Sequence, residues 1–195
     1  MAARVSRADE LAGTPAERVC LDALRAVSGE TDGAMERHCV RQFLIAERLA
    51  EDAQESVDRE LLLCAAFLHD AGLYPGVATQ DAYVTDGRHL AERTLEPFAW
   101  PPDRLNRCLD AVEQHHALRD RSSFGVEVEL MRRADLVDVS AGLVNFGIDR
   151  WWVRNLVREI PRSGFHRFLA RETWRMARER PRSLPHVFAP PGHTP

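Results

Sequence analysis

Four histidine or aspartate side chains, widely spaced along the chain, are of the types that bind a metal ion. Two of them, His69 and Asp70, are adjacent and end the apolar run at 61–68. A histidine precedes this pair at His38, and an acid follows it at Asp135. Two imidazoles and two carboxylates suit a divalent transition metal such as Zn, Mn, Fe, Co or Ni. Because His-Asp pairs also occur by chance, the pair is informative only together with the two distant residues.

Each of these residues lies on or at the end of a predicted helix. The pattern predicts helices at about 14–27, 34–51, 56–68, 87–96, 103–117, 126–141 and 164–180. It also predicts a helix that ends at about residue 160. Met131 and Asp135 lie on one core-facing line of their helix, where an acid is costly unless it is paired or binds a metal. No strand pattern of any length is visible, so we predict an all-α fold. Residues this far apart in sequence meet in the core of a helical bundle, where metal sites are usually built.

The chain of 195 residues suits a single domain. We expect residues 1–13 to be flexible, residues 14–180 to form the helical domain, and the proline-rich residues 181–195 to form a disordered or draped tail. The motif core covers about 34–141. Residues 71–85 are the longest break, and this loop either shapes a pocket beside the His-Asp pair or merely connects two helices.

Composition excludes several classes of function. A net charge of −4 is too mild to indicate nucleic acid or anionic lipid, and no apolar run approaches a membrane span. The N-terminus lacks the apolar segment of a secretory signal, so we expect a cytoplasmic protein with four reduced, buried cysteines. All 26 basic residues are arginine, which excludes Schiff-base or lysine general-base chemistry.

The order H…HD…D, with each residue in these helical contexts, resembles the HD-domain superfamily of metal-dependent hydrolases. The resemblance covers roughly residues 34–141. It implies an HD-domain helical bundle with a metal site in the core. The implied metal ligands are His38, His69, Asp70 and Asp135.

Further motifs are similar to the subfamily that includes cyanamide hydratase. The similar segments are HCVRQFL around His38, HDAGL around His69, YVTDGRHLA around Asp86 and AVEQHH around His115. Asp86-Gly87 stands where many members with two metal ions have histidine-glycine. The resemblance therefore favours one ion over two, although His89, one turn after Asp86, could restore the second.

By the same resemblance, metal-activated water attacks a small polar substrate that carries a C–N or nitrile-type group or a phosphoester. The implied catalytic residues are Asp70 or His115 to take or relay a proton, Asp86 to orient substrate or water, and Arg41 to clamp the substrate. Arg41 could instead form a salt bridge with an acid. His116 is expected to cap its helix or support a ligand. Leu73 replaces a lysine that lies near the phosphate in many phosphohydrolases, which weakens the case for a phosphate substrate.

Three alternatives stay open at the level of sequence. The protein could be a nucleotide phosphohydrolase, an HD-fold di-iron oxygenase, which needs four histidines, or a non-catalytic metal-binding regulatory module. The expected partner is a small-molecule substrate, with neither nucleic acid nor membrane. A homodimer is left open, with Trp151 and Trp152 packing in the core or at its contact.

Overall fold

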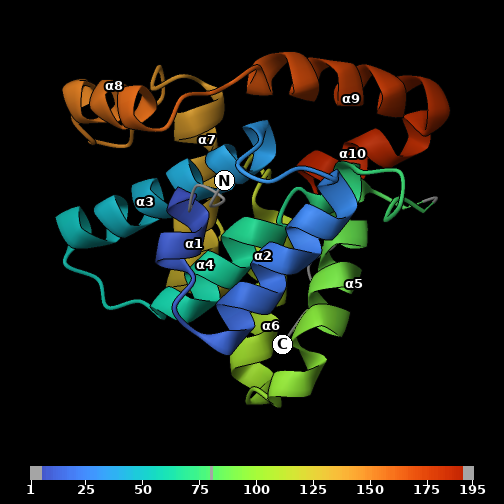
Figure 1. Ribbon diagram of the computed structural model, residues 1–195, viewed down its shortest axis with the longest axis horizontal. Coiled ribbons are helices and arrows are strands. Elements are labelled where there is room, and N and C mark those ends of the chain that lie inside the picture. Colours follow the sequence, from blue (N-terminus) through green and yellow to red (C-terminus); the bar gives the residue numbers. More distant parts are fainter. Residues whose placement is uncertain (1–5, 80, 191–195) are drawn as a thin grey trace, which may run out of the picture.

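The computed structural model describes residues 6–79 and 81–190 and consists of helices joined by short connections (Figure 1). The α-helices are α1 (Arg7–Leu11), α2 (Pro15–Ser28), α3 (Ala34–Ala53), α4 (Arg59–Leu68), α5 (Tyr83–Leu95), α6 (Pro102–Gln114), α7 (Val126–Val139), α8 (Arg150–Glu159), α9 (Phe165–Glu179) and α10 (Leu184–Phe188). Short 3-10 helices lie at Ala71–Leu73, Glu96–Phe98, Ser122–Phe124 and Pro181–Ser183. No strand occurs among the described residues, which confirms the all-α prediction.

Helix α4 is the centre of the bundle. Helices α2, α3, α5, α6 and α7 all pack against it (Figure 1). Its residues Leu61–Leu68 are fully buried, so every face of the helix is covered. A short helix that is apolar all round is stable only when it is enclosed in this way. The His69-Asp70 pair at its C-terminal end therefore lies in the interior of the protein.

The C-terminal third forms a covering layer over this bundle. Helices α8 and α9 run along one edge of the molecule, beside α7 and the start of α3, and α10 follows α9 (Figure 1). Phe165, the first residue of α9, is fully buried and stacks on His38, with ring centroids 4.0 Å apart. Part of the tail that we expected to be disordered or draped thus forms α10, whereas residues 191–195 lie outside the described residues.

Side-chain caps decide where several helices begin. Asp58 accepts a hydrogen bond from the backbone N–H of Leu61, so α4 begins there and not at Ser56 as we predicted. Within the N-terminal segment that we expected to be flexible, Ser6 and Asp9 form a capping box around α1. Residues 1–5 of that segment lie outside the described residues.

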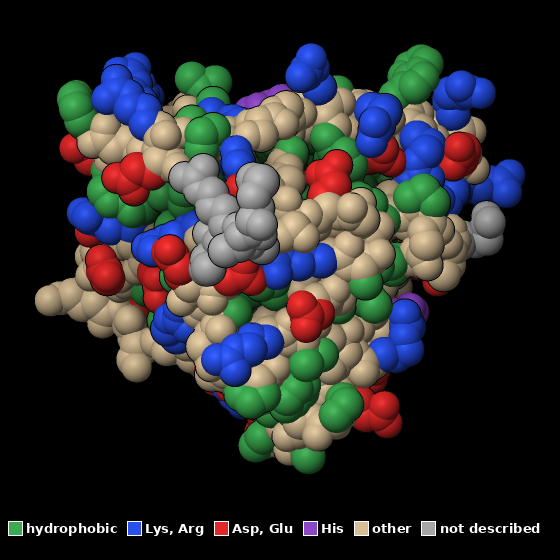
Figure 2. Space-filling model, viewed as in Figure 1, with side chains coloured by type: hydrophobic (Ala, Val, Ile, Leu, Met, Phe, Trp, Pro, Cys, Tyr) green, Lys and Arg blue, Asp and Glu red, His purple; other side chains and the backbone are tan. Residues whose placement is uncertain are grey.

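Acidic and arginine side chains are interspersed on the surface. Figure 2 shows blue and red groups intermingled over the face in view, with apolar side chains between them. Close ion pairs explain this arrangement; the Arg104 guanidinium, for example, lies 2.6 Å from both Asp58 and Glu60. Within the described residues no helix is long and apolar enough to cross a bilayer. All four cysteines are buried and unpaired.

The turn after the His-Asp pair packs directly on the start of α5. A Cβ atom at Gly72 would overlap the carbonyl oxygen of Tyr83 and lie 2.8 Å from the backbone nitrogen of Gly87. A Cβ at Gly87 would lie 3.2 Å from the carbonyl oxygen of His69. The two glycines therefore allow α5 to approach the end of α4 closely.

We expect Gly72→Ala to destabilise the protein by about 3 kcal/mol, because backbone atoms cannot move aside as a flexible side chain can. Gly76→Ala is the matched control, since nothing lies within 4 Å of its added methyl group. The control should be neutral or slightly stabilising. Urea denaturation of both variants measures the difference. Equal midpoints for the two variants would contradict the close packing.

Candidate metal centre

The four sequence-predicted metal ligands converge at one point inside the bundle. His38 comes from α3, His69 and Asp70 from the end of α4, and Asp135 from α7. His38 Nε2 lies 3.1 Å from His69 Nε2 and 3.3 Å from an oxygen of Asp135. His69 Nε2 lies 3.3 Å from an oxygen of Asp70. All four residues are at most 2% exposed, so the cluster is isolated from bulk water.

His115, at the end of α6, also reaches the cluster. Its Nε2 lies 3.4 Å from Asp70 Oδ1, whereas His38 and His69 approach the other oxygen, Oδ2. Two overlapping groups of donor atoms result, each with its atoms within 4.8 Å of one another. The groups are His38, His69 and Asp135, and His69, Asp70 and His115. His115 is thus placed as an outer ligand as well as a candidate acid or base.

The hydrogen bonds of the three histidines test whether a cation fits. Each Nδ1 atom faces a fixed acceptor: Asp138 at 2.7 Å for His38, the Ala66 carbonyl at 2.8 Å for His69, and the Val112 carbonyl at 2.6 Å for His115. The proton of a neutral imidazole therefore lies on Nδ1, and the lone pair on Nε2 points into the cluster. Partners of this kind are what orient metal-ligating histidines in known sites.

The surroundings of the two carboxylates also favour a bound cation. Asp70 Oδ1 and Asp135 Oδ1 are buried and accept no hydrogen bond from any described residue. Each lies near an imidazole instead, with Asp135 Oδ1 3.3 Å from His38 Nε2 and Asp70 Oδ1 3.4 Å from His115 Nε2. A divalent cation among these groups would stabilise the buried carboxylates. Imidazole nitrogens with carboxylate oxygens suit a divalent transition metal, so the residues present fit such an ion.

Asp138 supports the cluster and was not singled out by the sequence analysis. It accepts from His38 Nδ1 and, through both oxygens, from Arg41 Nε and Nη2 at 2.9 and 2.7 Å. Arg41 also donates to the carbonyl of Ile160 at 3.2 Å. The structure therefore shows the salt bridge that we left open for Arg41, with its guanidinium committed to Asp138. Asp138 could have been found from its position one turn after Asp135, as Arg41 lies one turn after His38.

Asp86 is buried, but its contacts lead away from the metal ligands. One oxygen accepts from the Thr79 backbone N–H and from Arg180, and the other accepts from the Thr79 hydroxyl. It thereby joins the loop before α5 to the end of α9. His89, on the same helix, is exposed and cannot restore a second metal ligand set.

His116 and Tyr83 complete the walls of the cluster. His116 Nδ1 lies 3.2 Å from the second oxygen of Asp135, and the Tyr83 hydroxyl lies 3.2 Å from His115 Nε2. Burial raises the pKa of Tyr83 well above its usual value, so its hydroxyl stays protonated and can donate. Burial also lowers the pKa of His116 to about 4, so this imidazole is neutral at pH 7. Tyr83 gave no signal in the sequence, because we placed it in the loop at 71–85, whereas α5 begins at Tyr83 and not at Gly87 as we predicted.

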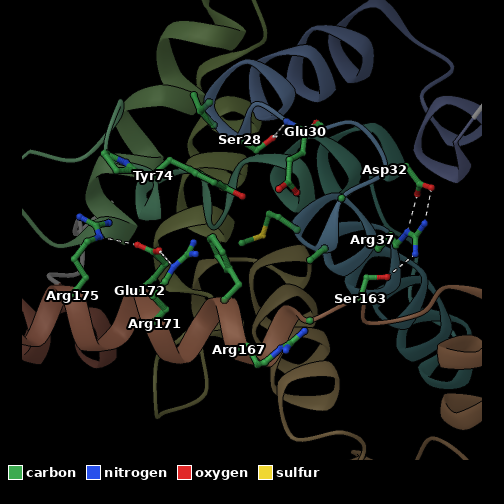
Figure 3. Close-up of a pocket in the computed structure, with 17 residues that line it drawn as sticks. Ser28, Glu30, Asp32, Arg37, Tyr74, Ser163, Arg167, Arg171, Glu172 and Arg175 are labelled. Atoms are coloured by element: carbon green, nitrogen blue, oxygen red, sulfur yellow. Dashed lines mark hydrogen bonds and ion pairs between the residues drawn. The ribbon is translucent and has the colours of Figure 1, made fainter. Parts of the chain in front are cut away.

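A separate cavity of about 1000 Å³ lies between the start of α3 and α9 (Figure 3). Along one wall α9 presents Arg167, Arg171, Glu172 and Arg175, and Tyr74 projects from the other side (Figure 3). None of the five candidate ligands lines it. Glu172 pairs with Arg171 and Arg175, so much of the charge in its lining is neutralised. This cavity therefore does not present a substrate to the metal centre.

The electrostatics of His38 make metal uptake depend on pH. Burial alone would lower its pKa, but the carboxylates of Asp135 and Asp138 outweigh burial and raise the pKa to about 9. Asp70 behaves in the opposite sense: burial would raise its pKa, but His69 and His115 hold the pKa well below its usual range. Near neutral pH the metal-free centre thus combines a protonated His38 with ionised carboxylates.

We expect metal affinity to rise with pH between about 6.5 and 9, by up to about tenfold per pH unit, because the ion must displace the His38 proton. The ion pairs of protonated His38 should stabilise the metal-free protein fully below about pH 6.5. That stabilisation should be lost as the pH rises through about 9. Calorimetric titration with Zn²⁺ in buffers of different ionisation enthalpy measures the released protons. An affinity that does not change over this range would contradict the assignment.

Comparison with known families agrees with this arrangement. The sequence model of the HD domain matches residues 35–140, which is more than half of the chain. No curated protein matches the sequence. HD domains are generally metal-dependent hydrolases, and the matched range contains all five residues of the two donor groups. The chain belongs to the HD domain family.

Proposed function

We propose that this protein is a metal-dependent hydrolase that acts on a small polar substrate. The observation that carries the proposal is the convergence of His38, His69, Asp70 and Asp135, whose Nε2 atoms and carboxylate oxygens lie close together in the buried core. One divalent ion held by these residues would lower the pKa of a bound water to about 7 and polarise the substrate.

The residues around this point can manage the protons of a hydrolysis. Asp70 lies between His69 and His115, so a proton taken by its carboxylate can pass to His115 Nε2, 3.4 Å away. The Val112 carbonyl fixes the His115 ring, which keeps Nε2 directed at Asp70. The Tyr83 hydroxyl, which stays protonated, can donate to His115 or to the substrate.

Charge around the centre favours an uncharged substrate group. Three arginines around it are paired with acids: Arg41 with Asp138, Arg132 with Glu129, and Arg180 with Asp86. Leu73 supplies no charge where many phosphohydrolases have a lysine. These features support a C–N or nitrile-type substrate, as in the cyanamide hydratase-like subfamily, over a phosphoester or a nucleotide. Asp86 and Arg41 then act through structure, by holding the loop and His38.

A second reading, a non-catalytic metal-binding module, has one observation in its favour. All five residues of the donor groups are at most 2% exposed, as in a closed structural site. The two readings differ in whether a position on the ion stays open to a small molecule.

Elemental analysis and a substrate panel test the proposal. The purified protein should contain about one divalent ion per chain and should hydrolyse cyanamide or a related nitrile faster than methyl phosphate. Activity should disappear with a chelator and return with the ion. Protein with a full complement of metal that hydrolyses no member of a broad nitrile, amide and phosphoester panel would favour the non-catalytic reading.

A further inference from the structure

A small cavity opens directly onto the metal centre. Its volume is about 140 Å³, and its polar lining is formed by His115, His116 and Asp135, with Arg132 beside them. The rest of the lining is formed by Ala117, Leu118, Leu136 and Phe188. Two residues of the donor groups therefore lie at one end of the cavity, and an apolar wall lies at the other. Arg132 adds little free charge, because Glu129 accepts from two of its nitrogens at 2.8 and 2.6 Å.

Phe188, at the end of α10, forms part of the mouth of this cavity. Its backbone oxygen accepts a hydrogen bond of 3.2 Å from the Leu118 N–H, which fixes α10 to the turn that carries the histidines. Its ring centroid lies 6.3 Å from that of His116. Phe188 is 46% exposed, so one side of its ring faces solvent while it also lines the cavity. Arg180 anchors the chain leading to α10 through Asp86.

The larger cavity in Figure 3 is no alternative entrance to the ion. None of the ligands lines it. Phe165, which is fully buried and stacks on His38 at 4.0 Å, does not line this cavity either. The small cavity at Phe188, by contrast, is lined by His115 and Asp135 of the donor groups, so a substrate that enters it can reach the ion.

Volume sets the size of what can fit. A protein cavity of about 150 Å³ accommodates benzene, which has about six non-hydrogen atoms. Sites for larger organic ligands span about 300–1,000 Å³. At about 140 Å³, this cavity is too small for a nucleotide and suits a compact molecule with one polar group at the ion and little beyond it.

We propose that Phe188 determines substrate size, and that the substrate class is compact molecules of up to about six non-hydrogen atoms. This inference rests on the proposed metal-dependent function, because it takes the ion as the point of attachment. Removing the Phe188 ring widens the mouth of the cavity, so that longer molecules can reach the same ion. Leu118 is exposed and lines the same mouth. Shortening its side chain should also admit longer molecules, but with a smaller effect than removal of the Phe188 ring.

Binding of hydroxamates to the Co²⁺-loaded protein tests the proposal without requiring turnover. The visible absorption of Co²⁺ should change when acetohydroxamate binds to the wild-type protein. Benzohydroxamate has about twice as many non-hydrogen atoms and should bind at least about tenfold more weakly than acetohydroxamate. Phe188→Ala should strengthen benzohydroxamate binding by about tenfold or more and change acetohydroxamate binding by less than about threefold. Leu118→Ala provides a second variant at the same mouth.

Trp174→Ala is the matched control, because it removes an exposed aromatic ring from neighbouring α9 that does not line the cavity. It should leave both affinities unchanged. Equal binding of the two hydroxamates to the wild-type protein would overturn the size limit while leaving the metal-dependent function intact. Benzohydroxamate binding that neither Phe188→Ala nor Leu118→Ala improves would overturn the assignment of this mouth. Failure of the protein to bind Co²⁺ would instead count against the metal centre itself.

Discussion

His69→Ala is expected to remove the metal ion and to lower hydrolytic turnover by at least about a thousandfold. His69 Nε2 belongs to both donor groups, so its loss leaves each group with only two donors. Metal content by elemental analysis and turnover of the best substrate in the panel measure the two effects. Asp70→Ala should behave in the same way.

The control for this experiment is His89→Ala, which removes an exposed histidine from α5. It should retain metal and activity. Circular dichroism must show that His69→Ala is still helical, so that loss of metal is not simply loss of fold. A folded His69→Ala protein with full metal content and turnover would refute the site.

Asp138→Ala is expected to cause the largest loss of stability, about 3–5 kcal/mol, because it leaves the Arg41 guanidinium buried without its counter-charge. Both Arg41 and Asp138 are fully buried, and two hydrogen bonds of 2.7 and 2.9 Å join them. The variant should also bind metal about 10- to 100-fold more weakly, because Asp138 orients the His38 ring. Urea denaturation with a chelator isolates the first effect, and calorimetric metal titration measures the second.

The matched control is Asp52→Ala, which breaks an ion pair of 2.9 Å with Arg48 on the surface of α3. Solvent-exposed pairs of this kind contribute between zero and about 1 kcal/mol. The control should therefore unfold at nearly the wild-type urea concentration and bind metal normally. If the two variants lost equal stability, the Arg41–Asp138 pair would not be the buried support that we describe.

The sequence was sufficient to predict which helices meet. The apolar run before His69 required a helix covered on all sides, and α4 is that helix. Asp135 on a core-facing line required a partner, and His38 lies 3.3 Å from it. These predictions succeeded because burial of a polar group without a partner costs free energy. A polar residue at a core-facing position of a helix therefore indicates a partner.

The partners of individual polar side chains could not be predicted in this way. Periodicity shows which face of a helix carries Arg41 or Asp86, but not which neighbour each side chain reaches. Arg41 reaches Asp138, and Asp86 reaches Thr79 and Arg180, because the tertiary arrangement brings these groups together. The position of Phe188 at the cavity beside the metal centre could not be predicted either, because a proline-rich segment has no periodicity that indicates where it packs.

Arg41 has a consequence for how the protein behaves as a whole. Its guanidinium bonds to Asp138, which orients His38. It also bonds to the carbonyls of Ile160 and Pro161, in the connection between α8 and α9 of the covering layer. The ion-binding interior and the outer layer are thus joined through one side chain. The two regions should therefore melt as a single cooperative unit, and an ion bound inside should slow fraying of the exterior helices.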